Sequence, residues 1–477
     1  MKDPKKTSMP GLTAVCVLAQ SNSLDESWQR LGAKTQAGSS STRRSPLTLV
    51  MGLDFGTAYT KVVIGENQAR ARYAISFDTL LKLRNRYLMP SLLATDANHH
   101  FHLGQSDQMR EYNHDIKMKL LMGQYDESTR IEATAFLALV LRYARYWFFQ
   151  THGNTYARYH LEWWLNVGLP SDSWEQSSLT DAYQKIALAA WQLSVAEAPI
   201  NRETVQQALS APETLQLIGD RFDHPDRIAI IPEFVAQITP YVKSTRKQND
   251  LHLLVDVGAG TLDVTTFNAH EYDGEDVFPI FEAKVERLGS RYYVAHLLAD
   301  LQCQVRWDEE ESSAYLYQFA QSAGLSRQEF QFRTQQFQRK VKSVIQKVLN
   351  TTRSYRYIKS PHWISGIPTF LCGGGSSIAL YRSVLQSDID QKIRLTPLEK
   401  PDNFKADYLQ STDFHRLSVA CGLSFSALDI GTIRPRAIVE DDFDVMKKSK
   451  PVERIICPAC NGDGNCYKCN GSGWITI

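Results

Sequence analysis

The sequence predicts an α/β protein with a small cysteine-rich tail. Short apolar, β-branched runs alternate with longer helical patterns from Leu47 to about Ile430. A second observation is that a stretch of the first half of this region is similar to a stretch of the second half. Hydrophobic residues make up 43% of the chain and charged residues 22%, as in ordinary globular domains.

The individual elements follow from these patterns in chain order. β-Branched and apolar runs bounded by turn residues indicate strands, and apolar residues at helical spacing indicate helices. Strands are expected at 47–53, 161–167, 228–231, 251–255 and 369–371, and helices at 132–149, 179–190 and 329–349.

Composition divides the 477 residues into four parts. Residues 1–46 are rich in Ser, Thr, Lys and Gly and are expected to be a disordered tail, because they bury too little apolar area to offset the entropy lost on ordering. Residues 47–440 form the α/β region, 441–454 a charged linker and 455–477 a cysteine-rich module.

Charge and apolar patterning exclude some classes of partner. The net charge of +1 gives no global attraction to nucleic acid or anionic membranes, so any basic patch must be local. No run approaches the roughly 20 apolar residues needed to span a bilayer, so no membrane span is expected. Four of the eight cysteines fall within 457–469, which favours a metal site in a reducing, cytoplasmic environment over a secreted disulfide framework.

The internal similarity joins residues 49–64 to residues 251–266. Asp54 aligns with Asp256 and Gly56 aligns with Gly258 at the same offset. Both copies read as an apolar strand, an aspartate, a glycine turn and a second strand. The chain is therefore expected to contain two related halves that face one another.

These turns have the chemistry of a phosphate site. Small residues let backbone N–H groups approach phosphate oxygens, and Thr57, Thr261 and Lys61 would add donors. A carboxylate beside a polyphosphate makes chemical sense only with a cation between them, and Mg²⁺ meets protein carboxylates largely through water. One such turn alone is more often a plain hairpin. Neither a Walker loop nor a complete Gly-x-Gly-x-x-Gly motif occurs.

At these residues the sequence resembles the actin-like ATPase superfamily, in particular the nucleotide-binding domain of DnaK-type heat-shock chaperones. The resembling segments are 54–57 and 256–264 for the two phosphate motifs, 230–238 for a helix that begins with Glu233, 370–378 for the adenosine motif and 420–423 for a second connecting helix. The resemblance implies two duplicated ribonuclease-H-like halves that bind ATP or ADP with Mg²⁺.

The resemblance also implies a role for each matching residue. Asp54, Glu233, Asp256 and Thr261 would be catalytic. The three carboxylates would organise Mg²⁺ and the attacking water, and Thr261 would hold phosphates. The nucleotide-binding residues would be Gly56, Thr57, Ala58, Tyr59, Lys61, Gly258, Ala259, Gly260, Gly289, Gly373, Gly374, Gly375 and Ser376.

The sequence departs from the chaperone pattern in three ways. Gln108 stands where the chaperones carry a catalytic lysine, which puts the rate of hydrolysis in question. Lys61 stands where actin and plasmid-segregation filaments carry a phosphate-binding lysine. The tail is also too short for the peptide-binding domain of a complete DnaK-type chaperone.

The tail contains two copies of Cys-x-x-Cys-x-Gly-x-Gly, with cysteines at Cys457, Cys460, Cys466 and Cys469. Four thiolates in two knuckles can close one tetrahedral Zn²⁺ site, whereas a redox pair or disulfides would not need both knuckles. The repeats resemble the zinc-binding region of DnaJ-type cochaperones, which has four such repeats. A closed four-cysteine site is structural, and it could contact a partner protein or nucleic acid.

Together these patterns predict an ATP-binding and ATP-hydrolysing, chaperone-like switch that acts through protein partners. The alternative is a filament-forming actin homologue of the plasmid-segregation type, favoured by Lys61 and by the missing peptide-binding domain. A third interpretation is a sugar kinase of the same fold, but this sequence contains no evident motif for the base that would activate the sugar.

Overall fold

The computed structural model describes residues 15–16, 27–34, 45–68, 71–81, 83, 85–104, 109–217, 225–272, 275–299, 301, 306–307, 313–434, 454–456 and 474–476. Contacts divide the chain into one unit of residues 1–433 and a second of residues 434–477. The first unit is a mixed α/β structure, as the alternation of strand and helix patterns predicts.

The first large sheet contains seven strands and carries one face of the cleft described below. Its order is β10 (Ile228–Pro232), β9 (Tyr159–Leu169), β2 (Ser45–Asp54), β3 (Tyr59–Glu66), β4 (Arg72–Ala74) and β17 (Phe404–Lys405), with β5 (Met89–Pro90) also paired to β3. Strand β2 is antiparallel to β3 and parallel to β9. Side chains of a strand alternate between faces. Accordingly, Leu49 and Met51 belong to the core cluster that includes helices α3 (Glu127–Tyr156) and α5 (Ser177–Ser194).

The second large sheet contains six strands in the order β16 (Ile393–Leu395), β15 (Ile367–Cys372), β11 (Asp250–Val257), β12 (Leu262–Tyr272), β13 (Glu275–Glu286) and β18 (Thr432–Arg434). Helix α10 (Arg327–Thr351) contacts β12 and β13. Both large sheets have the same pairing order, since each contains an antiparallel hairpin, two parallel strands on one side of it and an antiparallel strand on the other. The similar segments of the sequence fall on the hairpins β2–β3 and β11–β12.

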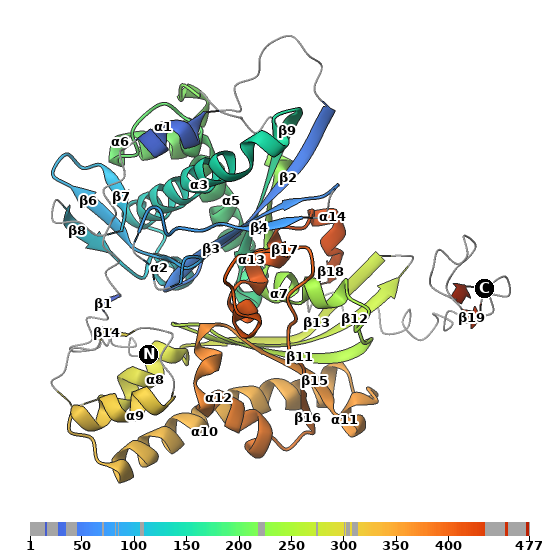
Figure 1. Cartoon of the computed structure of the whole chain (residues 1–477). Coiled ribbons are helices and arrows are strands. Elements are labelled where there is room, and N and C mark those ends of the chain that lie inside the picture. The colour runs from blue at the N-terminus through green and yellow to red at the C-terminus, as the bar shows by residue number, and fades with distance from the viewer. Residues whose placement is uncertain are drawn as a thin grey trace. The chain divides into compact units, whose positions relative to one another are not determined.

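Two helices lie between the large sheets, α7 (Glu233–Val242) and α13 (Ser418–Leu423) (Figure 1). They cross closely, because a Cβ atom on Gly422 would stand 1.6 Å from the carbonyl oxygen of Ala236. On the other side of α13, a Cβ atom on Gly52 of β2 would stand 2.5 Å from the carbonyl oxygen of Ala420. Glycines at these two points let the helices and the first sheet pack backbone to backbone.

The other elements surround this framework. A small sheet has the order β7 (Phe101–Leu103), β6 (Leu93–Asp96) and β8 (Met109–Asn113). The remaining elements are β14 (Arg306–Trp307), α2 (Ile116–Leu121), α4 (Ser171–Trp174), α6 (Arg202–Ser210), α8 (Ser290–Leu297), α9 (Ser313–Ser322), α11 (His362–Ser365), α12 (Ala379–Ser383) and α14 (Ala427–Ile430), with short 3-10 and π-helical turns between them.

The expectation of a disordered tail over residues 1–46 is wrong for part of that segment. Helix α1 (Ser27–Ala33) packs on α3, where the Trp28 and Tyr143 rings lie edge to face at 5.6 Å. Arg145 donates from Nε to the carbonyl oxygen of Gly32 at 3.0 Å. Strand β1 (Val15–Cys16) pairs with β14. A composition averaged over 46 residues conceals one short helix that carries a tryptophan.

The expected strands and helices are all present, with ends that differ by a few residues. The helix expected at 132–149 begins earlier, at Glu127, because Asp126 accepts a hydrogen bond from the N–H of Thr129 and caps the helix there. None of the described helices is long and apolar enough to cross a membrane.

In the second unit, β19 (Arg454–Ile456) pairs with β20 (Trp474–Thr476) in antiparallel register, with Ile455 opposite Ile475. The two strands bracket residues 457–473. The four cysteines expected to bind zinc and most of the expected linker lie outside the described residues.

Candidate functional site

A polar cleft in the first unit brings together most of the residues that the sequence singles out. It encloses about 70 Å³. Thirteen of its lining residues are among the expected catalytic and binding residues: Asp54, Gly56, Thr57, Ala58, Tyr59, Lys61, Glu233, Asp256, Gly258, Ala259, Thr261, Gly373 and Gly374. The others are Lys117, Pro170, Gln237, Asp263, His415, Arg416 and Val419. The two hairpin turns, which lie about 200 residues apart in the sequence, thus line one cavity.

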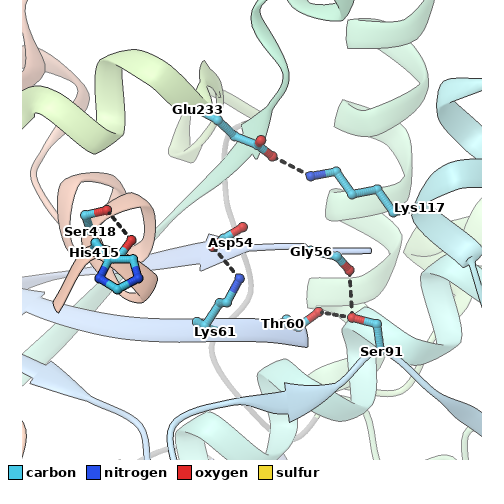
Figure 2. A network of polar contacts seen from close by, with 9 residues as sticks. All are labelled: Asp54, Gly56, Thr60, Lys61, Ser91, Lys117, Glu233, His415 and Ser418. Carbon is cyan, nitrogen blue, oxygen red and sulfur yellow. Dashed lines mark hydrogen bonds and ion pairs between the residues drawn. The ribbon is translucent and has the colours of Figure 1, made fainter. Parts of the chain in front are cut away.

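The turn between β2 and β3 forms one wall of the cleft. Asp54 ends β2 opposite Lys61 of β3, and the Lys61 Nζ atom lies 3.1 Å from Asp54 Oδ2 (Figure 2). The turn is tight at Gly56, where a Cβ atom would stand 2.1 Å from the Tyr59 carbonyl oxygen. Ser91 holds the turn in place, because its hydroxyl donates to the Gly56 carbonyl oxygen at 2.7 Å and its N–H donates to that of Ala58 at 2.8 Å.

The turn between β11 and β12 forms the opposite wall. Asp256 lies near the end of β11, and the N–H of Gly258 donates to the Thr261 carbonyl oxygen at 2.9 Å. The carbonyl oxygen of Gly258 accepts from the N–H of Ser290 at 3.0 Å, which seats the first turn of α8 under the hairpin. A Cβ atom on Gly289 would stand 2.6 Å from the Gly258 carbonyl oxygen. Gly289 therefore allows this close approach without lining the cleft.

The two turns approach each other directly. A Cβ atom on Gly260 would stand 3.3 Å from Cγ2 of Thr57 and 2.9 Å from Sδ of Met118 in α2. Gly260 lies at this junction and does not line the cleft. Small side chains at the junction are what allow hairpins from two different sheets to meet.

Glu233 and Lys117 form an ion pair inside the cleft. Glu233 is the first residue of α7, and its Oε1 atom lies 2.6 Å from Nζ of Lys117, which comes from α2 (Figure 2). Burial raises the pKa of Glu233, and Lys117 only partly offsets this effect. Burial alone would lower the pKa of the Lys117 ammonium, but the surrounding carboxylates, led by Glu233, raise it. Lys117 is therefore a charged group held among acidic side chains.

The cleft holds an excess of crowded negative charge around Asp256. Burial, together with the carboxylates of Glu233 and Asp54, raises the pKa of Asp256 to about 7. An added cation would relieve this crowding. Among the described residues, no three His, Cys, Asp or Glu side chains are close enough to hold a metal ion directly. The arrangement fits a hydrated Mg²⁺ ion, which keeps several waters and meets carboxylates through them.

The glycine segment after β15 closes the cleft beside Asp256. Gly373 has φ +80°, and a Cβ atom there would stand 2.1 Å from Asp256 Oδ1, so only glycine suits this position. Gly374 also lines the cleft, whereas Gly375 and Ser376 do not. Gly375 is buried against Val257, where a Cβ atom would stand 2.6 Å from Cγ1. Ser376 donates its hydroxyl to the Gly373 carbonyl oxygen at 2.7 Å.

The predicted site residues did not include five polar residues that line the cleft: Lys117, Gln237, Asp263, His415 and Arg416. Lys117 belongs to α2, where no sequence motif predicted a site residue. Gln237 is fully buried, and neither its amide oxygen nor its amide nitrogen has a hydrogen-bond partner among the described residues. Gln237 lies four residues after Glu233 in a segment with a helical pattern, so the sequence could have predicted that both side chains share one face of the helix. An orphaned amide at the wall of a cleft is a candidate ligand-binding group.

No protein-family model and no curated protein matches the chain. The geometry of the cleft and the sequence motifs are therefore the basis of the functional argument. Gln108, which stands at the position of the chaperone lysine, lies outside the described residues.

Proposed function

We propose that this protein is a magnesium-dependent, ATP-binding and ATP-hydrolysing molecular switch of the chaperone-like type, acting through protein partners in the cytoplasm. The observation that carries the proposal is that Asp54 and Asp256, from corresponding hairpins of two sheets, line one cleft with two small-residue turns. The zinc-bound tail would serve as a docking element for those partners.

The proposed fold is that of the actin-like ATPases, with two duplicated ribonuclease-H-like halves. Its support is the common pairing order of the two large sheets together with the sequence similarity between their first hairpins. The helices α7 and α13 would be the connecting helices of that fold.

In the proposed mechanism the two turns hold the phosphates. The N–H groups and hydroxyls around Thr57 and Thr261 would donate to phosphate oxygens, and Lys61 would add a positive charge. Bound Mg²⁺ would neutralise charge on the phosphates and on the leaving group. The carboxylates of Asp54, Glu233 and Asp256 would accept hydrogen bonds from the metal-bound waters and orient the attacking water.

Lys117 and Gln237 extend this mechanism. Lys117 would stabilise the negative charge that develops on the transferred phosphoryl group. In the chaperones a lysine would have this role at the position where this chain has Gln108. The unpartnered amide of Gln237 would bind the attacking water beside Glu233. Both groups are buried, so little reorganisation would accompany the reaction.

The small size of the cleft suggests how nucleotide binding would change the conformation of the protein. Its volume of about 70 Å³ is well below the ~300–1,000 Å³ of typical small-molecule sites. A nucleotide would therefore enter only if the two hairpins move apart, and it would hold them at a new separation. A partner that binds one separation better than the other would respond to the nucleotide state.

The first prediction concerns Asp256→Asn. The change removes a crowded carboxylate, so hydrolysis should stop while the nucleotide-free protein gains about 1–3 kcal/mol of unfolding free energy near neutral pH. Phosphate release measures hydrolysis and urea unfolding measures the unfolding free energy, while calorimetric titration of the parent protein with Mg-ATP and Mg-ADP measures nucleotide binding. Asp402→Asn, at an exposed loop carboxylate, is the control and should change none of them. Absence of any heat with either nucleotide would reject the proposal.

One specific observation favours the alternative function, a filament-forming actin homologue. Lys61 lines the cleft beside Asp54, and it corresponds to the phosphate-binding lysine of actin and the plasmid-segregation filaments. Sedimentation with Mg-ATP separates the two readings. Pelleting above a threshold concentration supports a filament, and a species that stays in the supernatant at all concentrations supports the switch.

A further inference from the structure

A basic segment lies outside the nucleotide cleft and has no part in the proposed mechanism. Residues 330–387 contain nine Lys and Arg residues and no Asp or Glu. This segment carries +9 and the rest of the chain −8, so the net charge of +1 conceals a strong local asymmetry. Most of its cations lie on α10 and the π-helical turn η3 (Thr352–Arg356) that follows it.

These residues line an open groove of about 630 Å³. The lining residues recur every three or four positions, so they share one face of the helix: Arg339, Lys342, Ser343, Gln346, Lys347, Asn350, Thr351, Ser354 and Tyr355. The face extends about 24 Å along the helix axis, at about 1.5 Å per residue. Every lining side chain is polar, and no carboxylate is among them.

The cations of this groove are available to a ligand. Arg339 and Lys347 are exposed and Lys342 is half-buried. None of the three forms an ion pair with a carboxylate of the described residues. At the rim, Asp390 donates its backbone N–H to Gln346 at 3.3 Å, but its exposed side chain does not line the groove.

Tyr355 gives the groove an aromatic surface at one end. Tyr355 is 80% exposed, so the face of its ring is open to a ligand. An exposed ring beside cations and amides is the combination that binds single-stranded nucleic acid, where bases stack on the ring and the backbone follows the positive charges. A membrane surface would instead favour aliphatic side chains beside the cations, and the groove lining has none.

We propose that this basic groove binds single-stranded nucleic acid, with phosphates on Arg339, Lys342 and Lys347 and a base stacked on Tyr355. The inference is independent of the nucleotide cleft, whose residues come from other elements. RNA and single-stranded DNA share the chemistry that the groove recognises, and the experiment separates them.

The test uses the full-length protein and fluorescein-labelled single strands of mixed sequence. A length of about 15 nucleotides covers the ~4–16 nucleotides that one such site occupies. Anisotropy is measured with RNA, with DNA of the same sequence and with the duplex. From about 50 to 200 mM salt, three phosphate contacts on a single strand should give a slope of about −2 in log K against log salt.

Two groove variants test the two halves of the proposal. The triple variant Arg339→Gln, Lys342→Gln, Lys347→Gln should lower affinity at least tenfold and bring the salt slope close to zero. Tyr355→Ser should lower affinity by about fivefold to a hundredfold with the slope unchanged, because stacking is not a phosphate contact. The matched control replaces three exposed cations elsewhere, Lys185→Gln, Arg202→Gln and Lys405→Gln, and should bind as the parent protein does.

Three outcomes would overturn the proposal. One is no anisotropy change with any single strand at low salt. Another is that the control triple variant lowers the affinity as much as the groove triple variant, which would mean that binding depends on the overall charge of the protein and not on this groove. The third is binding to phosphatidylserine vesicles without binding to single strands, which would make the groove a membrane contact. Circular dichroism of each variant confirms that it is folded before binding is measured.

Discussion

At the scale of single residues, the electrostatics of the cleft depend on Lys117. It is the buried cation that meets Glu233, and its pKa is raised because acidic groups surround it. Without a bound ligand, this ammonium does part of what a metal ion would do, since it offsets the repulsion among the carboxylates. Lys61 contributes from the other side through Asp54, but its side chain is more exposed.

The second prediction therefore concerns Lys117→Met, which removes the charge and keeps the length of the side chain. Breaking a buried pair leaves Glu233 uncompensated, so the unfolding free energy should fall by roughly 3–5 kcal/mol. If Lys117 also stabilises the transferred phosphoryl group, hydrolysis at saturating Mg-ATP should fall by about 10²–10³-fold. Urea unfolding and single-turnover kinetics measure these effects.

Lys119→Met is the matched control on the same helix. Lys119 pairs with Glu132 at 2.8 Å but is partly exposed, so its loss should cost about 1 kcal/mol or less and leave hydrolysis unchanged. Equal losses in the two variants would show that neither the burial nor the position of Lys117 matters.

A third prediction at the residue scale concerns pH and the histidine at the centre of the second sheet. His252 is fully buried, its Nδ1 lies 2.8 Å from the Asp250 carbonyl oxygen and its ring stacks on Phe267. Burial lowers the pKa of His252 to about 4. The unfolded chain, with its ordinary pKa near 6.5, binds the proton first as the pH falls.

The contribution of neutral His252 is therefore fully present above about pH 6.5 and is lost between about pH 6.5 and 4, by roughly 3 kcal/mol. Urea unfolding across this window measures the loss. His252→Gln keeps a donor and an acceptor but does not titrate, so its unfolding free energy should fall less steeply with acid. Parallel pH profiles for the two proteins would contradict this account.

At the scale of elements, the crossing of α7 and α13 controls the distance between the two sheets. The helices touch through Gly422 and the backbone of Ala236, and α13 reaches the first sheet through Gly52. These contacts are backbone to backbone, so no side chain can yield when a methyl group is added. Glu233 begins α7, and its position in the cleft depends on the same crossing.

The fourth prediction is that Gly422→Ala destabilises the protein by about 2 kcal/mol or more, because the added methyl would overlap the Ala236 carbonyl. It should also weaken nucleotide binding by displacing Glu233. Gly153→Ala is the control. Gly153 lies inside α3 with nothing within 4 Å of an added Cβ, so this change should stabilise the helix by about 0.5–1 kcal/mol. Thermal melting and calorimetric titration compare the two variants.

At the scale of the whole molecule, the chain consists of two units, each defined by the contacts among its own residues. The large unit buries extensive apolar cores around its two sheets. The small unit contributes one described strand pair, β19–β20, around the cysteine repeats. In the proposed zinc module of about twenty residues, we expect metal binding and folding to be coupled, because so short a segment cannot supply a hydrophobic core.

The fifth prediction is that the protein carries one zinc per chain and that a chelator removes it without lowering the melting temperature of the large unit. Elemental analysis and differential scanning calorimetry measure the two quantities. Cys457→Ser with Cys460→Ser should abolish zinc binding, because two thiolates do not close a tetrahedral site. Cys303→Ser, outside the repeats, should keep it. Zinc retained in the double variant would contradict the assignment.

The sequence alone determined the fold class, the strands of the two similar hairpins and the acidic turns at their ends. These features are local: strand and helix periodicity, glycine turns and the repeated aspartates are readable from neighbouring residues. Within 1–46, the expectation of disorder was wrong at α1, because that helix is stabilised by Tyr143 and Arg145, which belong to a helix distant in the sequence.

Only the tertiary structure decided which polar groups meet. Lys117 and Glu233 lie 116 residues apart, and no local pattern connects them. Likewise, the sequence motif did not distinguish the glycines that line the cleft from Gly289 and Gly375, which allow close packing beside it. The physical reason is that burial, charge pairing and close approach are properties of contacts between distant segments, and these contacts exist only once the chain has folded.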